Sequence, residues 1–305
     1  MPRPWCLIRA AAPAVVAGLA VLAAPVAGQQ QDFSQVQIKT TPVAGKVHML
    51  EGAGGNIGVS AGDDGLLIVD DQFAPLADKI KAALKAIHDG DLAFVLNTHW
   101  HGDHTGGNPA FGLEALIVAH DNVRVRLSTE QTVRGNKVPP LPPEGLPVIT
   151  FGEAMTIHFN GEAIQLIHAP AGHTDGDSLI YFPTSNVLHM GDHFFNGRFP
   201  YVDLGSGGTV QGMAKNVKMA LDAFPADVKI IPGHGALATR TDLETFHRMI
   251  EHSLQTVKAG ISAGKSLEEL QQAGLGNQYE DWGSGFIPAD FWIQTVYESL
   301  QQNTP

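Results

Sequence analysis

The sequence predicts an α/β protein with the architecture of a four-layer αβ/βα sandwich. Short apolar runs typical of strands lead into an amphipathic helix, and this order of strands followed by helix occurs twice along the chain. The chain has 305 residues, 44% of them hydrophobic, so it is long enough to bury a substantial core. Two sheets packed face to face, with helices outside, satisfy this pattern, and no linker or tandem repeat divides it.

The first 28 residues differ from the rest. Arg3 and Arg9 precede an apolar run over residues 10–27, which ends in small residues before Gly28, and this pattern is typical of a secretory signal peptide. The alternative is an uncleaved membrane anchor, which 18 residues are just long enough to form, but the two prolines in the run favour cleavage. We predict a signal peptide over residues 1–28, one domain over 29–305, and export to the periplasm or the exterior without stable membrane association.

The first half of the mature chain contains five predicted strands and two predicted helices. Apolar runs predict the strands, around 46–50, 56–60, 65–70, 93–98 and 115–119. One helix is predicted over 75–87, where Leu76, Ile80, Ala83, Leu84 and Ile87 share a face, and another near 121–127. In the loop 135–147, prolines exclude regular hydrogen bonding, so the loop forms either a rigid flap over a site or surface packing.

The second half repeats the order of strands and helices. Strands are predicted near 148–151, 155–159, 163–168, 178–182, 186–190 and 228–231, and helices near 209–223, 241–259 and 289–302.

The segment His99-Trp100-His101-Gly102-Asp103-His104 holds four metal-binding side chains in six residues and follows the predicted strand 93–98. Imidazole and carboxylate are ligands that zinc takes, and neighbouring ligands in this segment can turn toward two different ions. A single histidine is more often a surface residue, but four such side chains after one strand indicate a metal site.

Neither ion can be coordinated by this segment alone, so further ligands are expected at the ends of later strands. Three candidates each follow an apolar run and lie beside a glycine: His173, Asp192 and His234.

The motifs His-x-His-x-Asp-His, Gly-His-Thr, Gly-Asp and Pro-Gly-His-Gly, in this order, resemble the metallo-β-lactamase-fold hydrolase superfamily over roughly residues 45–240. The resemblance implies a four-layer sandwich that holds two zinc ions per chain, with iron or manganese as alternatives. It also implies the ligand sets: His99, His101 and His173 for one ion, Asp103, His104 and His234 for the other, and Asp192 bridging both.

One departure bears on the substrate. Many zinc β-lactamases have cysteine at the position of Asp192, whereas aspartate there resembles glyoxalase II-like thioesterases and lactonases. The single cysteine, Cys6, lies far upstream, so no thiolate enters the site. We therefore expect a metal-dependent hydrolase of a small-molecule carbonyl substrate, with a β-lactam-like cyclic amide or lactone favoured and an ester or thioester next.

In the expected mechanism, two cations hold a water between them and lower its pKa toward neutrality, so that a metal-bridging hydroxide attacks the carbonyl. Asp103 has a second expected role as a catalytic residue that accepts a hydrogen bond from this hydroxide and relays a proton to the leaving group.

Substrate contacts are expected from residues beside the ligands. Trp100 either shapes the pocket floor or belongs to the core. In the aromatic segment 194–201, Asn196 offers an amide donor and Arg198 a cation suited to a substrate carboxylate.

A second set of polar residues lies next to the ligands in sequence: Asn97, Thr174, Asp175 and Asp177. These residues either orient the imidazoles through their outer nitrogens or cap the loops. His193 is expected to point away from the site, and His168 and His189 to be structural.

Charge argues against a nucleic-acid substrate. Removal of residues 1–28 takes away two arginines and no acids, which leaves 17 basic and 31 acidic residues and a net charge of −14. Two other functions fit parts of the pattern: a mononuclear iron oxidoreductase resembling persulfide dioxygenases, and a non-catalytic metal-binding protein of the envelope. The full set of seven ligands favours two ions and hydrolysis, while the sequence leaves the oligomeric state open.

Overall fold

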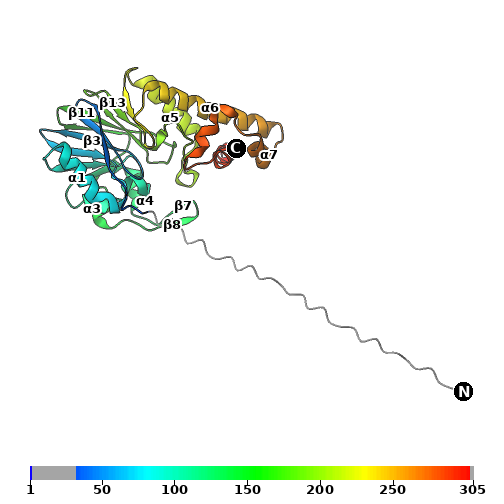
Figure 1. Cartoon of the computed structure of the whole chain (residues 1–305), viewed down its shortest axis with the longest axis horizontal. Coiled ribbons are helices and arrows are strands. Elements are labelled where there is room, and N and C mark those ends of the chain that lie inside the picture. Colours follow the sequence, from blue (N-terminus) through cyan, green and yellow to red (C-terminus); the bar gives the residue numbers. More distant parts are fainter. Residues whose placement is uncertain (2–31, 303–305) are drawn as a thin grey trace. The chain divides into compact units, whose positions relative to one another are not determined.

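Two β-sheets pack against each other between two layers of helices (Figure 1). The computed structural model describes Met1 and residues 32–302, and apart from Met1 the predicted signal peptide lies outside the described residues. From Phe33 onward the described residues form one compact unit. This architecture confirms the predicted four-layer sandwich.

The first sheet contains, in the described part of the chain, seven strands in the order β1-β2-β3-β4-β5-β6-β9. Their bounds are β1 (Lys39–Ala44), β2 (Val47–Glu51), β3 (Ile57–Gly62), β4 (Gly65–Val69), β5 (Leu92–Leu96), β6 (Leu116–His120) and β9 (Ile149–Phe151). Strands β1 to β4 pair antiparallel, and β4, β5, β6 and β9 pair parallel. Every residue of β4 is buried, as expected for a strand covered on both faces.

The second sheet has the order β10-β11-β12-β13-β14, counted over residues 32–302. Its strands are β10 (Ala154–Phe159), β11 (Glu162–His168), β12 (Ser178–Phe182), β13 (Val187–His189) and β14 (Lys229–Ile231). Only β13 and β14 pair parallel, with Leu188 opposite Ile230.

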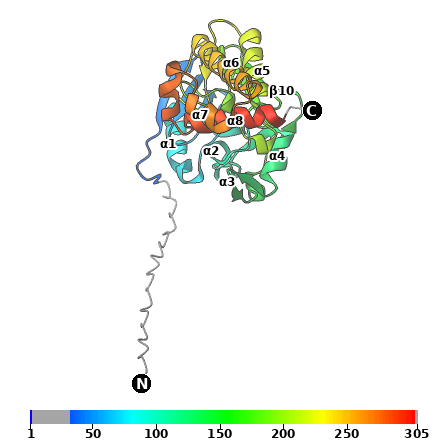
Figure 2. The same ribbon diagram turned by 90° about the vertical axis from the view of Figure 1, so that its right-hand side faces the viewer.

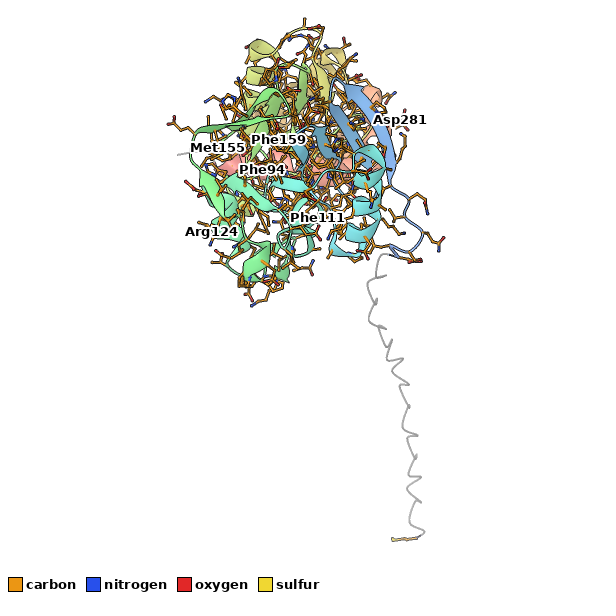
Figure 3. The ribbon with its side chains drawn as sticks, turned by 90° about the vertical axis from the view of Figure 1, so that its left-hand side faces the viewer. Phe94, Phe111, Arg124, Met155, Phe159 and Asp281 are labelled. Carbon is orange, nitrogen blue, oxygen red and sulfur yellow. The ribbon has the colours of Figure 1, made fainter. Side chains whose placement is uncertain are left out.

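The central core lies between the sheets. It combines inward side chains of the first sheet, such as Leu67 and Leu96, with those of the second, such as Leu166 and Ile180. Phe94 and Phe159 meet there edge to face, with ring centroids 5.6 Å apart (Figure 3).

Helices cover both outer faces. The helices are α1 (Ala77–Ile87), α2 (Gly102–Thr105), α3 (Asn108–Phe111), α4 (Asp121–Leu127), α5 (Val210–Ala223), α6 (Arg240–Ser262), α7 (Leu267–Ala273) and α8 (Ala289–Gln302). The apolar face of α1 packs on the first sheet through Ile80 and Leu84, as its spacing predicted. On the other side, α6, α7 and α8 lie side by side (Figure 2). None of the helices in the described residues is both long and apolar enough to cross a bilayer.

Several elements were not predicted: the edge strand β1, the short helices α2 and α3, helix α7, and the hairpin of β7 (Gln131–Val133) and β8 (Asn136–Val138). The hairpin corrects the interpretation of residues 135–147 as a loop without regular hydrogen bonds. Because the prolines begin at Pro139, β8 ends before their effect on hydrogen bonding starts.

Candidate metal centre

The seven predicted ligands come together at one edge of the two sheets, where they follow the carboxyl ends of four strands. The segment His99–His104 follows β5, His173 follows β11, Asp192 follows β13, and His234 follows β14. Strands β11, β13 and β14 run in the same direction, so their carboxyl ends point to the same edge. The fold therefore gathers ligands that lie up to 135 residues apart in the sequence.

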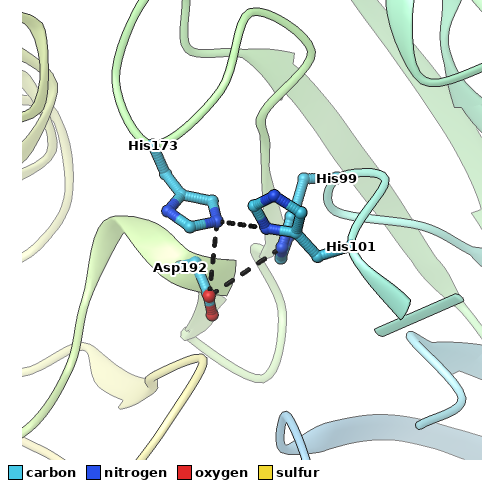
Figure 4. A group of neighbouring side chains, drawn as sticks. All are labelled: His99, His101, His173 and Asp192. Atoms are coloured by element: carbon cyan, nitrogen blue, oxygen red, sulfur yellow. Dashed lines mark hydrogen bonds and ion pairs between the residues drawn. The ribbon is translucent and has the colours of Figure 1, made fainter. Parts of the chain in front are cut away.

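The first group consists of His99, His101, His173 and Asp192, all buried (Figure 4). One potential ligand atom from each lies within 4.8 Å of the others. Nδ1 of His101 is 2.8 Å from Nε2 of His173, and Oδ2 of Asp192 is 3.4 Å from the same Nε2 and 3.8 Å from Nε2 of His99.

The second group consists of Asp103, His104 and His234. Nε2 of His234 is 3.3 Å from Oδ2 of Asp103 and 3.4 Å from Nε2 of His104. The other carboxylate oxygen of Asp192, Oδ1, lies 3.1 Å from His104 and 3.4 Å from His234. The Asp192 carboxylate thus faces both groups, one oxygen toward each.

In four of the imidazoles, the ring nitrogen that faces away from the site lies within hydrogen-bond distance of a protein oxygen. The pairs are His99 Nδ1 with Thr98 Oγ1 (3.0 Å), His101 Nε2 with Asp203 Oδ2 (3.0 Å), His173 Nδ1 with the Tyr201 carbonyl (2.7 Å) and His104 Nδ1 with Asp70 Oδ2 (2.7 Å). The carbonyl and the carboxylates can only accept, and the Thr98 hydroxyl donates its hydrogen to Asp70. Each ring therefore donates outward and turns a lone pair toward the site.

These lone pairs fit metal ions. The buried Nε2 of His99 has no hydrogen-bond partner, although buried polar atoms are normally satisfied. Lone pairs on His101 and His173 face each other at 2.8 Å, an arrangement that is repulsive unless a cation or a proton lies between them. Nitrogen and carboxylate ligands with ordered outer partners are the usual setting for divalent zinc.

The electrostatics of the residues also favour cations. Burial lowers the pKa of His99, and it lowers the pKa of His173 to about 4, so both rings are neutral. Although burial opposes the charged form, Asp192 and Asp103 raise the pKa of His234 to about 9. Burial likewise opposes ionisation of Asp103, but the neighbouring imidazoles outweigh it and lower the pKa of Asp103 to about 2. Burial opposes the charged form of His104 too, but Asp192, Asp103 and Asp70 raise its pKa. The ionised carboxylates thus create a negative potential, and a metal cation at the second group would take the place of the protons on these two rings.

Two glycines are required by the close approach of these ligands. A Cβ on Gly55 would overlap the ring of His104, and a Cβ on Gly233 would overlap Oδ1 of Asp192. The first glycine of the Pro-Gly-His-Gly motif, Gly233, thus leaves room for the Asp192 carboxylate, which faces both groups.

None of the four outer partners was predicted from the sequence, and two of them, Asp70 and Asp203, are carboxylates. Asp70 follows β4, is fully buried and has a left-handed backbone conformation with φ of 65°. Asp203 lies in the loop before α5 and holds His101. The position of Asp70 directly after the buried run Gly65–Val69 was a usable signal, since the other ligands also follow strands. Asp203 follows no strand and offered no such signal.

All four expected outer residues stabilise loops instead. Asn97 pairs with Asn108, Asp177 accepts from the backbone N–H and the hydroxyl of Thr174, and Asp175 forms a two-bond ion pair with Arg126. The capping alternative therefore describes these residues.

His193 is buried under Gly172 and lies 3.0 Å from the Asn216 amide. His189 is also buried and contacts the Asn56 carbonyl, and His168 stacks on His120. None of these three rings belongs to the two ligand groups found among the described residues.

The three expected substrate contacts have different surroundings. Trp100 is only 2% exposed and packs in a cluster with Val123 and Leu127, so its side chain is core. The Asn196 amide donates to the Ala236 carbonyl and ties two loops together. Arg198 is half-buried beside Gly285.

Comparison with known proteins agrees with this geometry. The profile described as the metallo-beta-lactamase superfamily matches residues 51–234, more than half of the chain. The chain belongs to this superfamily. Residues 51–234 include all seven candidate ligands, so the match and the site coincide.

Individual members of the superfamily are distant. The metallo-beta-lactamase type 2 of Bacteroides fragilis is 21% identical over 66% of this chain and 77% of its own length. A hydroxyacylglutathione hydrolase of Nitrosococcus oceani is 29% identical over 46% of this chain and 47% of its own. The structure of a stereoselective inverting sec-alkylsulfatase from Pseudomonas sp. superposes with a TM-score of 0.65 at 15% identity, over 86% of this chain and 50% of that one. This chain thus spans about half the length of the last two proteins.

Proposed function

We propose that this protein is an exported dinuclear zinc hydrolase that cleaves the acyl bond of a small-molecule carbonyl substrate. The observation that carries the proposal is the set of four imidazoles whose N–H groups point outward to protein oxygens, so that their lone pairs converge on the Asp192 carboxylate. Membership of the superfamily supports a metal-dependent hydrolase.

Each group would hold one ion: His99, His101 and His173 the first, Asp103, His104 and His234 the second, with Asp192 shared. When bound, two divalent cations lower the pKa of a water between them and polarise a carbonyl oxygen. The protein holds the ligands in fixed tautomers through Thr98, Asp203, Tyr201 and Asp70, since each outer acceptor takes the N–H of its ring.

Asp103 is the proposed catalytic residue. Its side chain is 30% exposed, in contrast to the 5% exposure of Asp192, so it reaches the open side of the site. There its ionised carboxylate would accept a hydrogen bond from the attacking water and pass a proton to the leaving group.

The proposed substrate is a β-lactam-like cyclic amide or a lactone, with an ester or thioester as the next class. The names of the relatives support carbonyl hydrolysis, since one is a metallo-beta-lactamase and another a hydroxyacylglutathione hydrolase. The net charge of −14 without residues 1–28 argues against nucleic acid, and the composition of those residues supports export.

The test is the metal content of the mature protein, measured by elemental analysis, together with hydrolysis of a chromogenic cephalosporin and a simple lactone. We expect about two zinc ions per chain and chelator-sensitive turnover of at least one substrate. One iron per chain and no turnover would refute the proposal and favour the mononuclear oxidoreductase, and metal binding without turnover would favour a carrier. An intact N-terminus after secretion would contradict cleavage.

A further inference from the structure

A row of aromatic side chains leads away from the metal centre and ends at an arginine. Tyr201 lies beside the first ligand group, with its ring centroid 5.7 Å from that of His101 and 5.9 Å from that of His173. The ring of Phe291 on α8 follows at 6.4 Å from Tyr201. We call Tyr201, Phe291 and the neighbouring Phe286 the aromatic strip.

Arg134 lies over the outer end of the aromatic strip. Its guanidinium carbon is 4.9 Å from the ring centroid of Phe291 and 4.9 Å from that of Phe286. Stacking on aromatic faces leaves the N–H edges of a guanidinium free to donate to an anion. Within residues 32–302, no carboxylate forms an ion pair with Arg134. The side chain is exposed, as is Phe286 at 66%, so a small molecule can reach both.

The hairpin that carries Arg134 is anchored close to the site. Val133, next to the turn, and Val138, at the far end of β8, pack in the cluster of Trp100, which is the residue between two ligands. The hairpin is therefore anchored beside the metal-binding segment, through one residue next to the turn and one at its base.

The turn is also an unusual place for an arginine. Arg134 and Gly135 both have positive φ, 49° and 79°, which defines a two-residue hairpin loop that favours Asn-Gly. A left-handed backbone conformation is unfavourable for a residue with a long side chain, so arginine does not stabilise the turn. The presence of arginine at this position is therefore better explained by the contacts of its side chain.

From these contacts we infer that Arg134 is a specificity-determining residue, which binds the anionic end of a substrate whose apolar body lies along the aromatic strip. The inference rests on the proposed function, since the reacting carbonyl would lie at the metal centre beside Tyr201. It assigns the substrate class: a carbonyl compound with an apolar chain and a terminal carboxylate. It also places the anion contact at Arg134 and not at Arg198.

The test compares two esters that differ in one charge, nitrophenyl hydrogen glutarate and nitrophenyl pentanoate. Arg134→Asn gives the turn its preferred Asn-Gly sequence, so loss of function through misfolding is not expected. We expect this variant to lower the ratio of kcat/KM for the anionic over the neutral ester about tenfold or more, mainly through KM. Arg134→Lys should keep part of the ratio, because lysine keeps the charge without the planar stack.

Two further variants separate the alternatives. Arg248→Asn, an exposed arginine on α6 that donates to Thr245, is the matched control and should leave the ratio unchanged. Arg198→Asn tests the other cation. A loss of the ratio in Arg198→Asn with no loss in Arg134→Asn would overturn the inference.

A binding measurement keeps the inference testable without turnover. Calorimetry with phenylbutanoate and phenylbutanol should show that the wild type prefers the carboxylate and that Arg134→Asn does not. Preference that survives in Arg134→Asn but disappears on chelation would place the carboxylate on the metals and overturn the inference. If neither ester is hydrolysed by the metal-loaded wild type, the proposed hydrolase fails, while calorimetry still decides the role of Arg134.

Discussion

Replacement of Asp70 by asparagine should weaken one of the two metal sites more than the other. The Asp70 carboxylate is fully buried and accepts three hydrogen bonds: from the Thr98 backbone N–H at 2.8 Å, from the Thr98 hydroxyl at 2.8 Å and from His104 Nδ1 at 2.7 Å. An amide of the same shape can keep the first of these bonds. It then presents an NH2 group toward the other two partners.

The change acts on the tautomer of His104. With an NH2 group facing Nδ1, the ring is favoured with its proton on Nε2, which is the atom that faces His234 and Asp192. Loss of an outer partner of this kind weakens metal binding about 10- to 100-fold, or about 1.4–2.7 kcal/mol. The first group should be affected less, because His101 and His173 keep their acceptors, Asp203 and the Tyr201 carbonyl. Within that group the change reaches only His99, whose outer partner Thr98 loses its bond to Asp70.

The assay is a zinc titration in competition with a chromophoric chelator, which resolves two affinities. We expect Asp70→Asn to lower one of them more than the other, and Asp203→Asn to do the reverse. Asp222→Asn is the matched control, since that carboxylate is exposed and pairs only with Lys218. Unchanged affinities in Asp70→Asn, or an equal loss of both ions, would show that Asp70 does not orient His104 as the structure indicates.

Three other predictions concern the same centre. Asp103→Asn should reduce turnover by about 100-fold while the zinc content falls much less, and full activity would remove Asp103 from the chemistry. Gly233→Ala should reduce zinc content, because the new methyl group overlaps the Asp192 carboxylate. Gly102→Ala is the control and should keep its zinc, because no atom lies within 4 Å of the added methyl group. Equal zinc content in the two variants would contradict the steric argument. Zinc at about 100 times its Kd should stabilise the folded protein by about 2.7 kcal/mol. Removal of this zinc with a chelator should therefore lower the Tm by roughly 5–10 °C. An unchanged Tm would mean that zinc does not bind the folded state preferentially.

Local sequence determined the ligands and most of the elements near them. The segment His99–His104 carries its chemistry in six consecutive residues, and β4, β5 and α1 have apolar patterns that their own side chains decide. The glycines beside the ligands were visible as well, because a close approach of backbone to side chain admits no other residue.

Which residues of these segments contact one another was decided by the tertiary structure. Asp70 reaches His104 across 34 residues, Asp203 reaches His101 across 102, and Arg134 meets Phe286 and Phe291 through the hairpin. The position of Asp70 after a buried run marks it as a candidate, but the partners in these contacts have no signature in the sequence. A buried carboxylate or an exposed arginine is the same residue whatever it faces. The packing of the two sheets brings the strand ends to one edge, and that packing arises from apolar contacts spread over the whole chain.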